Sequence, residues 1–364
     1  MNDTVKYRNI WNIAYPIILG SIAQNVINFT DTAFLGHVGE IELGASAIGG
    51  IFYLALIMLG WGFGIGTQII IARRDGEGNF KAIGKTFQHA LYFNIIVALF
   101  LVVFIRFYSN NLLENILQSK EIYEASRAYL KIRAFGVFFA FINFVFRAFY
   151  TGIAKTKVIT WTTIVMASVN VFLDYSLIFG NFIFPEMGIE GAALASLIAE
   201  MSACLFFLGY TLKMIPSEKY PLFRFVKFNF KLLRRILTVA FPMMLQNFIS
   251  LSGWFVFFVF VESMGERPLA ISNIIRSIYV VLMIPIWGFA SATNTLVSNL
   301  IGQNKKHEVI PVTVKIVKMC FTAVVFVVSL SLIFPRQVLS LYTENQNLIQ
   351  DTIPVYYVVA GAAV

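Results

Sequence analysis

The chain has 364 residues, of which 58% are hydrophobic and only 13% are charged, and its mean hydropathy is +0.76. Soluble globular proteins carry about 25% charged residues, so this chain has too few charges to cover a surface that faces water. These figures predict an all-α, polytopic membrane protein. Cys204 and Cys320 both lie in apolar stretches and form no CxxC motif, which excludes a disulfide framework.

Ten stretches are apolar over the roughly 20 residues that a helix needs to cross a bilayer. The first is not a signal peptide, because it is too long and contains Pro16 and several polar residues. We expect the spans at about 11–35, 44–72, 87–107, 131–151, 158–180, 189–213, 234–262, 269–298, 311–334 and from 353 to the end.

The positive charges favour one side of the membrane. The N-terminus and the loops after even-numbered spans, with their flanks, hold 20 of the 28 Lys and Arg residues. The other loops hold seven, among them Arg106, Arg127, Lys131 and Arg133, and Arg276 lies inside a span. The positive-inside rule then predicts a cytoplasmic N-terminus. The excess of nine positive charges is therefore a topology signal, and nucleic-acid binding is not expected.

The sequence repeats itself with an offset of 226 residues. Six spans precede the second copy, so both copies cross the membrane in the same orientation, as in transporters built from parallel repeats. We expect a first lobe at 1–213, a linker at 214–231 and a second lobe at 232–364 that lacks about 75 residues, leaving about ten of twelve helices. Matching positions are Pro16 and Pro242, Gly39 and Gly265, Ser46 and Ser272, Trp61–Phe63 and Trp287–Phe289, Thr67 and Thr293, and Gly76 and Gly302.

Three acidic residues lie well inside the expected spans: Asp31, Asp174 and Glu200. An ionisable residue at such a depth costs about 2.5–3.5 kcal/mol to insert, so a functional role is the default interpretation. Asp31 and Asp174 are both in the outer third of outward-running spans, which places them at a similar depth. Helix spacing puts Gln24 and Asn28 on the face of Asp31, and Asn170 on the face of Asp174.

These groups predict a cluster that binds a cation or a proton, with Ser196 at comparable depth and Glu200 about one turn deeper. The alternative is that the carboxylates only tie helices together, and for Glu200 a structural hydrogen bond is an equal possibility. His37 and His307 fall in loops and His89 falls near a helix start, so all three are expected to be solvated. No dedicated metal site is expected, although Na⁺ would suit the same oxygens.

Several motifs resemble the MATE family of multidrug and toxic compound extruders over essentially the whole chain. They include YPIILGSIAQNVINFTDTAFLGHVG, RRDGEGN, FRAFYTGIAKTK, NVFLDYSLIFG, GIEGAALAS and AFPMMLQN. The resemblance implies twelve helices in two six-helix lobes and export against an inward H⁺ or Na⁺ gradient, with no further cofactor.

The DinF-like branch of that family is similar in an aspartate at Asp31, an Asn-x-x-x-Asp at Asn170 and Asp174, and a helix 6 hydroxyl matched by Ser196. The NorM-like branch carries a glutamate eight residues after the helix 7 proline, where this chain has Ser250. The resemblance therefore favours the DinF-like branch and a coupling site at Asp31, Asn170, Asp174 and Ser196, supported by Gln24, Asn28 and Glu200.

The leading hypothesis is a monomeric, cation-coupled antiporter of the bacterial inner membrane that exports small organic compounds. A lipid-linked oligosaccharide flippase would need a cavity rich in Arg and Lys, and Arg276 is the only basic residue expected deep in a span. An intramembrane aspartyl protease would need a GxGD motif, whereas VFL precedes Asp174. We therefore expect no enzyme activity.

Overall fold

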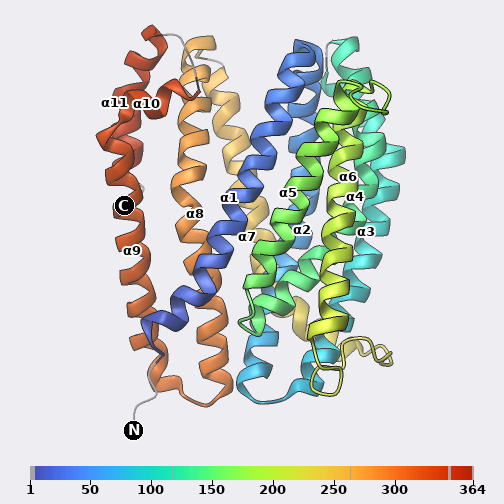
Figure 1. The fold of residues 1–364 in the computed structure, drawn as a ribbon, viewed down its shortest axis with the longest axis vertical. Helices are drawn as coiled ribbons and strands as arrows, with labels where there is room; N and C mark the ends of the chain where they lie inside the picture. Colours follow the sequence, from blue (N-terminus) through green and yellow to red (C-terminus); the bar gives the residue numbers. More distant parts are fainter. Residues whose placement is uncertain (1–4, 118, 263, 343–345, 363–364) are drawn as a thin grey trace.

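The computed structural model describes residues 5–117, 119–262, 264–342 and 346–362, and in these ranges the regular structure is entirely helical (Figure 1). A bilayer supplies no hydrogen-bond partners to the backbone, so a spanning chain that does not close into a barrel must be helical. The helices are α1 (Tyr7–Val38), α2 (Glu40–Gly76), α3 (Phe80–Ile116), α4 (Lys120–Gly152), α5 (Lys157–Ile178), α6 (Gly188–Met214), α7 (Phe230–Glu262), α8 (Glu266–Gly302), α9 (Val309–Ile333), α10 (Pro335–Ser340) and α11 (Gln346–Ala362), with a 3₁₀ turn at Lys306–Glu308.

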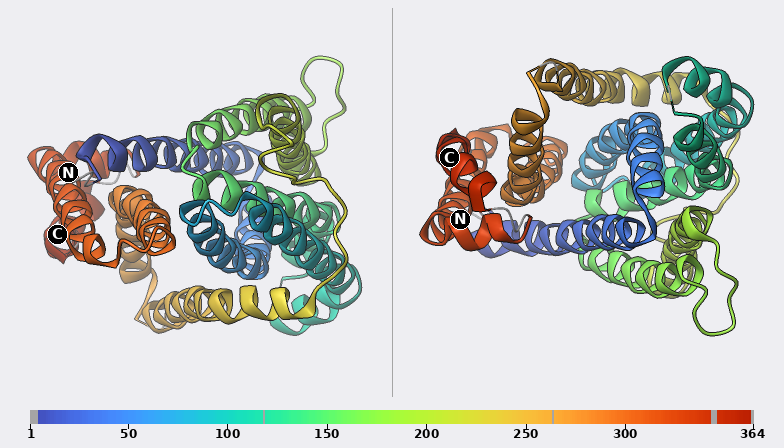
Figure 2. Two further views of the ribbon diagram at one scale, coloured as in Figure 1. Left: turned by 90° about the horizontal axis from the view of Figure 1, so that it is seen from below. Right: turned by 90° about the horizontal axis from the view of Figure 1, so that it is seen from above.

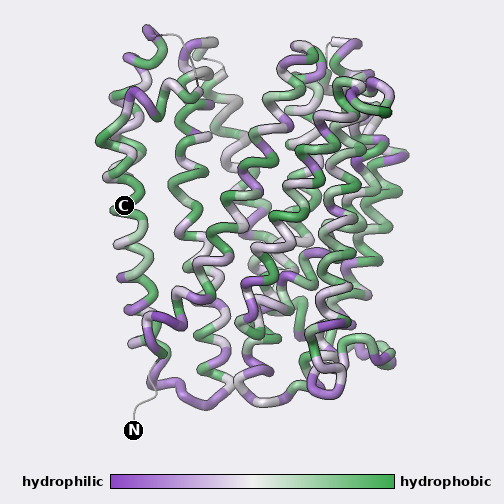
Figure 3. Tube along the Cα trace, viewed as in Figure 1, coloured by the Kyte–Doolittle hydropathy of each residue, from purple (hydrophilic) through white to green (hydrophobic). Residues whose placement is uncertain are grey.

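Eight of these helices, α1–α6, α8 and α9, are long and apolar enough to cross a membrane. The helices α7 and α11 occupy the other two stretches predicted to be spans. Hydrophilic residues gather at the two ends of the bundle and hydrophobic residues fill its middle (Figure 3). The prediction of an all-α, multi-pass membrane protein is thereby confirmed.

The helix α4 begins eleven residues before the expected span at 131–151. Ser119 caps its first turn by accepting a hydrogen bond from the backbone N–H of Ile122 at 3.3 Å. Lys, Glu, Ala and Arg residues favour helix, so the helix continues through the charged segment before the apolar stretch. As a result Arg133 lies well inside α4, and its expected position in a loop was wrong.

Helix boundaries repeat with the offset found in the sequence. The bounds of α2 become those of α8 when 226 is added to each. Each of α2 and α8 follows a glycine, Gly39 or Gly265. The bounds of α2 and α8 thus follow the repeat, and we refer to α1–α6 and α7–α11 as the two halves.

The contacts between the halves obey the same symmetry. A Cβ atom at Gly62 of α2 would lie 2.6 Å from the Cα of Met244 in α7. A Cβ atom at Gly288, the counterpart of Gly62, would meet the side chain of Ile18, the counterpart of Met244. The absence of a side chain at Gly62 and Gly288 thus lets α2 approach α7 and α8 approach α1 in equivalent ways.

The halves meet at the end of the bundle that carries the N-terminus, which we call the closed end. There Ile10 and Ala14 of α1 form one buried cluster with Phe289 and Ala292 of α8. The helix segments involved are the first part of α1 and α7 and the last part of α2 and α8. Towards the opposite end the two halves diverge (Figures 1 and 2).

The chain between α6 and α7, residues 215–229, lies against the start of α3. Gln88 donates to the carbonyl of Leu222 at 2.9 Å, and the N–H of Asn229 donates to Nε2 of His89 at 2.8 Å. Nδ1 of His89 lies 2.8 Å from the carbonyl of Lys85. His89 is fully buried, so its expected solvation was wrong. The sequence could not show that the linker folds back over this helix.

Candidate functional site

The close packing of α1 on α5 depends on a proline. Pro16 has no N–H, so it cannot donate to the carbonyl of Asn12 four residues earlier in α1. The hydroxyl of Thr156, just before α5, donates to that carbonyl at 3.1 Å, and Thr160 of α5 donates to the carbonyl of Pro16 at 2.7 Å. Helix α5 thus satisfies backbone groups at the proline and fixes the register of α1 against α5.

This register brings Asp31 of α1 next to Asn170 and Asp174 of α5, and we call these residues the polar trio. Asn170 and Asp174 are one turn apart on α5 and fully buried, whereas Asp31 is partly exposed. The structure therefore places together the three side chains that the sequence grouped by depth and helical face.

The polar trio has an unusual number of unsatisfied atoms. Among the residues the structure describes, Oδ1 of Asp31, both amide atoms of Asn170 and both carboxylate oxygens of Asp174 are buried without a hydrogen-bond partner. A buried polar group without a partner costs about 1–3 kcal/mol, and two ionised carboxylates side by side repel each other. A proton or a hard cation between these oxygens would relieve both penalties.

The other expected members form no hydrogen bond with the polar trio within the described residues. Ser196 is buried on α6. Gln24 and Asn28 are exposed on α1. The described part of the chain contains no group of three or more His, Cys, Asp or Glu residues that could hold a metal ion.

Glu200 belongs to a different cluster on the same side of the half. Arg133 of α4 donates to both carboxylate oxygens of Glu200, at 2.7 and 2.9 Å, and Tyr53 of α2 donates to the same carboxylate at 3.1 Å. The guanidinium of Arg133 also stacks over the Tyr53 ring at 4.0 Å. Asn143 donates to the backbone carbonyl of Glu200 at 2.9 Å. The glutamate therefore serves as the partner of a buried arginine.

Arg133 connects this cluster electrostatically to the polar trio, because its charge acts on both Asp31 and Asp174. Arg133 was not among the predicted site residues, because it begins an apolar stretch and was assigned to a loop. The glycine one turn later was an available signal: a Cβ at Gly136 would collide with the Arg133 guanidinium and the Glu200 carboxylate. A glycine one turn from an arginine can therefore indicate that space is needed for the guanidinium group.

A second expectation about basic residues was also wrong. Arg276 is not the only basic residue deep in a span, because Arg133 lies inside α4, and Arg147 lies in the same helix and stacks over the Trp61 ring at 5.0 Å. The charge of Arg133 is paired with Glu200, which accepts from both of its terminal nitrogens, so Arg133 is not a free cation for a pyrophosphate.

Polar contacts at the closed end were not anticipated either. Gln68 of α2 donates to the backbone carbonyl of Ser291 and to the hydroxyl of Thr295 in α8, both at 3.0 Å. Asn299 of α8 donates to Asp75 of α2 at 3.1 Å. These bonds cross between the halves, so separation of the closed end requires that they break.

A sequence model of the MatE family matches residues 16–176 and 242–362. The chain is 26% identical over 352 residues to the probable multidrug resistance protein NorM of Thermotoga maritima, covering 94% of this chain and 74% of that protein. It is 25% identical over 307 residues to the protein of the same name from Agrobacterium fabrum, covering 84% of this chain and 65% of that protein.

The fold is similar to solved structures over nearly its whole length. One is described as the outward-facing conformation of a multidrug resistance MATE family transporter of the MOP superfamily, with a TM-score of 0.88 at 22% identity, covering 96% of this chain and 77% of that one. A MOP superfamily transporter from Pyrococcus furiosus has a TM-score of 0.85 at 22% identity, covering 95% and 76%. At this identity the likeness concerns the fold.

Proposed function

The chain belongs to the MatE family of multi-pass membrane transporters, and on this premise we propose that it is a cation-coupled antiporter. It exchanges inward H⁺ or Na⁺ for small organic compounds, cationic or amphipathic, and exports them across the bacterial inner membrane. The observation that carries this proposal is the polar trio, whose buried carboxylates and amide lack partners within the described residues.

The polar trio is suited to reversible binding of an ion. Carboxylate and amide oxygens are ligands for Na⁺, and adjacent carboxylates also share a proton readily. Asp31 is partly exposed while Asp174 is fully buried, so Asp31 is the entry point for the ion. When the ion leaves, the carboxylate of Asp31 is free to hold a cationic substrate. Substrate and ion therefore compete for Asp31.

The arrangement of the halves supports alternating access. They are packed together at the closed end and diverge at the other, and the closed end carries the N-terminus (Figure 1). If the N-terminus is cytoplasmic, as the distribution of Lys and Arg favours, this is an outward-open state. Rocking of the halves about their common axis would open the closed end in turn.

The available energy is adequate for such a cycle. One charge crossing 100 mV yields about 2.3 kcal/mol, and one pH unit adds about 1.4 kcal/mol. Together they would sustain roughly a thousandfold gradient of a neutral substrate exchanged for one proton.

The substrate class rests on the relatives, which are named as probable multidrug resistance proteins. The flippase alternative gains no support, because the buried Arg133 is held by Glu200.

The test is transport by the purified protein in proteoliposomes, with an inward H⁺ or Na⁺ gradient imposed separately and a cationic dye such as ethidium as substrate. One gradient should drive dye transport in the wild type, and the double variant Asp31→Asn with Asp174→Asn should lose it while keeping its thermal unfolding midpoint. Glu114→Gln, a change of an exposed acid outside the trio, is the matched control. Gradient-driven transport that survives in the double variant would place coupling elsewhere.

A further inference from the structure

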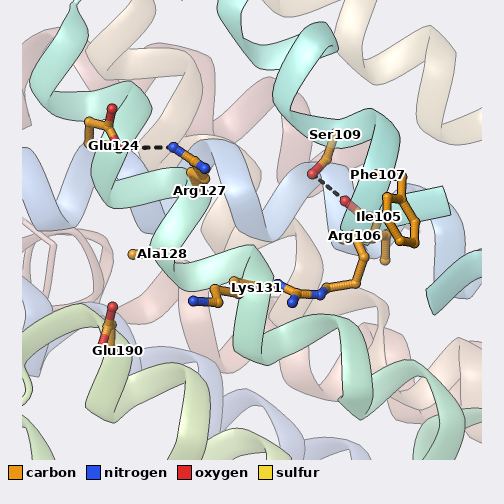
Figure 4. Close-up of a pocket in the computed structure, with 9 residues that line it drawn as sticks. All are labelled: Ile105, Arg106, Phe107, Ser109, Glu124, Arg127, Ala128, Lys131 and Glu190. Atoms are coloured by element: carbon orange, nitrogen blue, oxygen red, sulfur yellow. Dashed lines mark hydrogen bonds and ion pairs between the residues drawn. The ribbon is translucent and has the colours of Figure 1, made fainter. Parts of the chain in front are cut away.

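A hollow of about 470 Å³ lies on the flank of the first half, towards the end opposite the N-terminus. It is formed by α3, α4 and α6 and is separate from the polar trio (Figure 4). Its volume is within the range of ligand pockets, about 300–1,000 Å³. The side chains that define its chemistry are Arg106, Phe107, Glu124, Arg127, Lys131 and Glu190.

Positive charge predominates in this hollow. Arg127 pairs with Glu124 at 3.6 Å, and both side chains are half exposed. Neither Arg106 nor Lys131 forms an ion pair with any residue that the structure describes, and Glu190 is the one remaining acid of the lining. Arg106 extends from α3 towards α4, which carries Lys131 (Figure 4). Two cations therefore line the hollow with a single unpaired acid to balance them.

The hollow lies beside an apolar stripe on α3. On α3, Leu99, Phe100, Val103 and Phe107 form an apolar stripe at helical spacing and are each at least half exposed. Arg106 follows Val103 on that stripe, at the end of the stretch predicted from the sequence to span the membrane at 87–107. A ligand held by Arg106 would thus have lipid-facing apolar side chains directly beside it.

The position of these cations also departs from the topology of the rest of the chain. The loops and flanks on this side of the membrane hold few of the 28 Lys and Arg residues, yet Arg106, Arg127 and Lys131 gather in one hollow. Positive charge on this side works against the orientation signal, which suggests that the cations serve a local purpose.

We propose that this hollow binds the phosphate headgroup of an anionic phospholipid from the leaflet on that side. The guanidinium of Arg106 and the ammonium of Lys131 donate to the phosphate oxygens, and an acyl chain lies along the stripe that ends at Phe107. Guanidinium groups bind phosphate oxygens through paired, charge-assisted hydrogen bonds, and basic pockets between membrane helices recognise anionic lipid headgroups. The proposal does not depend on what the protein transports.

The test is native mass spectrometry of the purified protein in detergent, titrated with phosphatidylglycerol or with phosphatidylethanolamine of the same acyl chains. The wild type should bind the first phosphatidylglycerol about tenfold more tightly than phosphatidylethanolamine. The double variant Arg106→Gln with Lys131→Gln should lose this preference. The double variant Lys120→Gln with Arg336→Gln removes two exposed cations from the same side outside the hollow and should keep it.

Further arms distinguish a lipid site from a site for soluble phosphate compounds. Lys131→Arg keeps the charge and should keep the preference, and equal thermal unfolding midpoints without lipid would show that the variants fold. Millimolar glycerol 3-phosphate or inorganic phosphate should not displace phosphatidylglycerol, and displacement would mean that the site takes a soluble phosphate compound. Equal binding of the two lipids by the wild type, or an equal loss in the control variant, would overturn the proposal.

Discussion

Arg133 and Glu200 illustrate how a charged pair can be kept inside the first half. Only 11% of the arginine side chain and 13% of the glutamate side chain are exposed, so both charges have left water. Such a pair gains little net stability, since desolvation offsets attraction, but loss of one partner leaves a buried charge without compensation. The pair therefore fixes the position of a charge near the polar trio.

Single substitutions in this pair should cost more stability than the double substitution. Arg133→Met or Glu200→Leu alone should destabilise the protein by about 3–5 kcal/mol, whereas both changes together should recover most of that loss. Arg127→Gln breaks an exposed pair with Glu124 and should cost about 0–1 kcal/mol. Thermal unfolding in detergent measures all four variants, and a double variant no more stable than either single one would show that the pair is not self-contained.

Tyr220 of the linker gives a pH dependence with a defined sign. It is 5% exposed and donates to Asp75 at 3.3 Å. Burial, together with the neighbouring Asp75 carboxylate, raises the pKa of Tyr220 above its ordinary value. The raised pKa means that the stability contributed by the neutral phenol is present below about pH 10 and is lost at higher pH, where the unfolded chain ionises first.

Tyr220→Phe should therefore lower stability by about 1.5 kcal/mol at pH 7–9, and this difference from wild type should shrink above pH 10. Unfolding midpoints of both proteins between pH 7 and pH 11 test this. The exposed Tyr108, changed to Phe, should show no such dependence. A difference that stays constant with pH would mean that the phenol does not control docking of the linker.

At the scale of elements, the order of the long helices was predictable, because the bilayer restricts the chain to helices and the repeat copies their boundaries. The partners of individual side chains were harder to predict from the sequence. Asn170 and Asp174 share a helical face that spacing alone reveals, whereas the partner of Arg133 depends on the early start of α4. Asp75 lies in the last turn of α2, and its bond to Asn299 depends on how the two halves pack.

The glycine pair at the contact of the halves provides a test of helix packing with an internal control. A Cβ at Gly62 would meet the backbone of Met244, which cannot move without the helix. At Gly288 the nearest atom, at 2.5 Å, belongs to the Ile18 side chain, and the backbone oxygen of Ala14 follows at 3.1 Å. Gly62→Ala should cost about 1–3 kcal/mol through overpacking. Gly288→Ala should be milder, because Ile18 can change its rotamer and alanine favours helix.

Thermal unfolding of the two variants, which occupy equivalent positions of the repeat, measures the difference directly. Equal effects would mean that the contacts of α2 with α7 and of α8 with α1 are equally rigid.

At the scale of the whole molecule, the closed end combines an apolar cluster with a few polar bonds that cross between the halves. The symmetry brings α2 and α8 together at their last turns, where a Cβ at Gly76 would meet the carbonyl of Asn299 and one at Gly302 would meet the carbonyl of Arg73. This close approach of the backbones sets the geometry of the polar bonds that cross between the halves. The bond from Asn299 to Asp75 involves a charged acceptor and is the strongest of them by type.

Asn299→Ala should therefore shift the molecule towards opening at the closed end. A hydrogen bond to a charged group contributes about 1.5–3 kcal/mol, which corresponds to a shift in population of roughly tenfold to a hundredfold.

Spin labels at Lys81→Cys and His307→Cys, in a protein whose two native cysteines are replaced by serine, report the separation of the halves at the closed end. These exposed positions are related by the repeat and flank the contact. Pulsed electron paramagnetic resonance should show a longer distance population in Asn299→Ala than in the wild type. Gln303→Ala is the matched control, since Gln303, the residue that follows α8, donates to Asn299 at 2.6 Å and makes no bond across the halves among the described residues. If Asn299→Ala and Gln303→Ala give the same distances as the wild type, the apolar cluster alone holds this end shut, and the polar bonds only align the two helices.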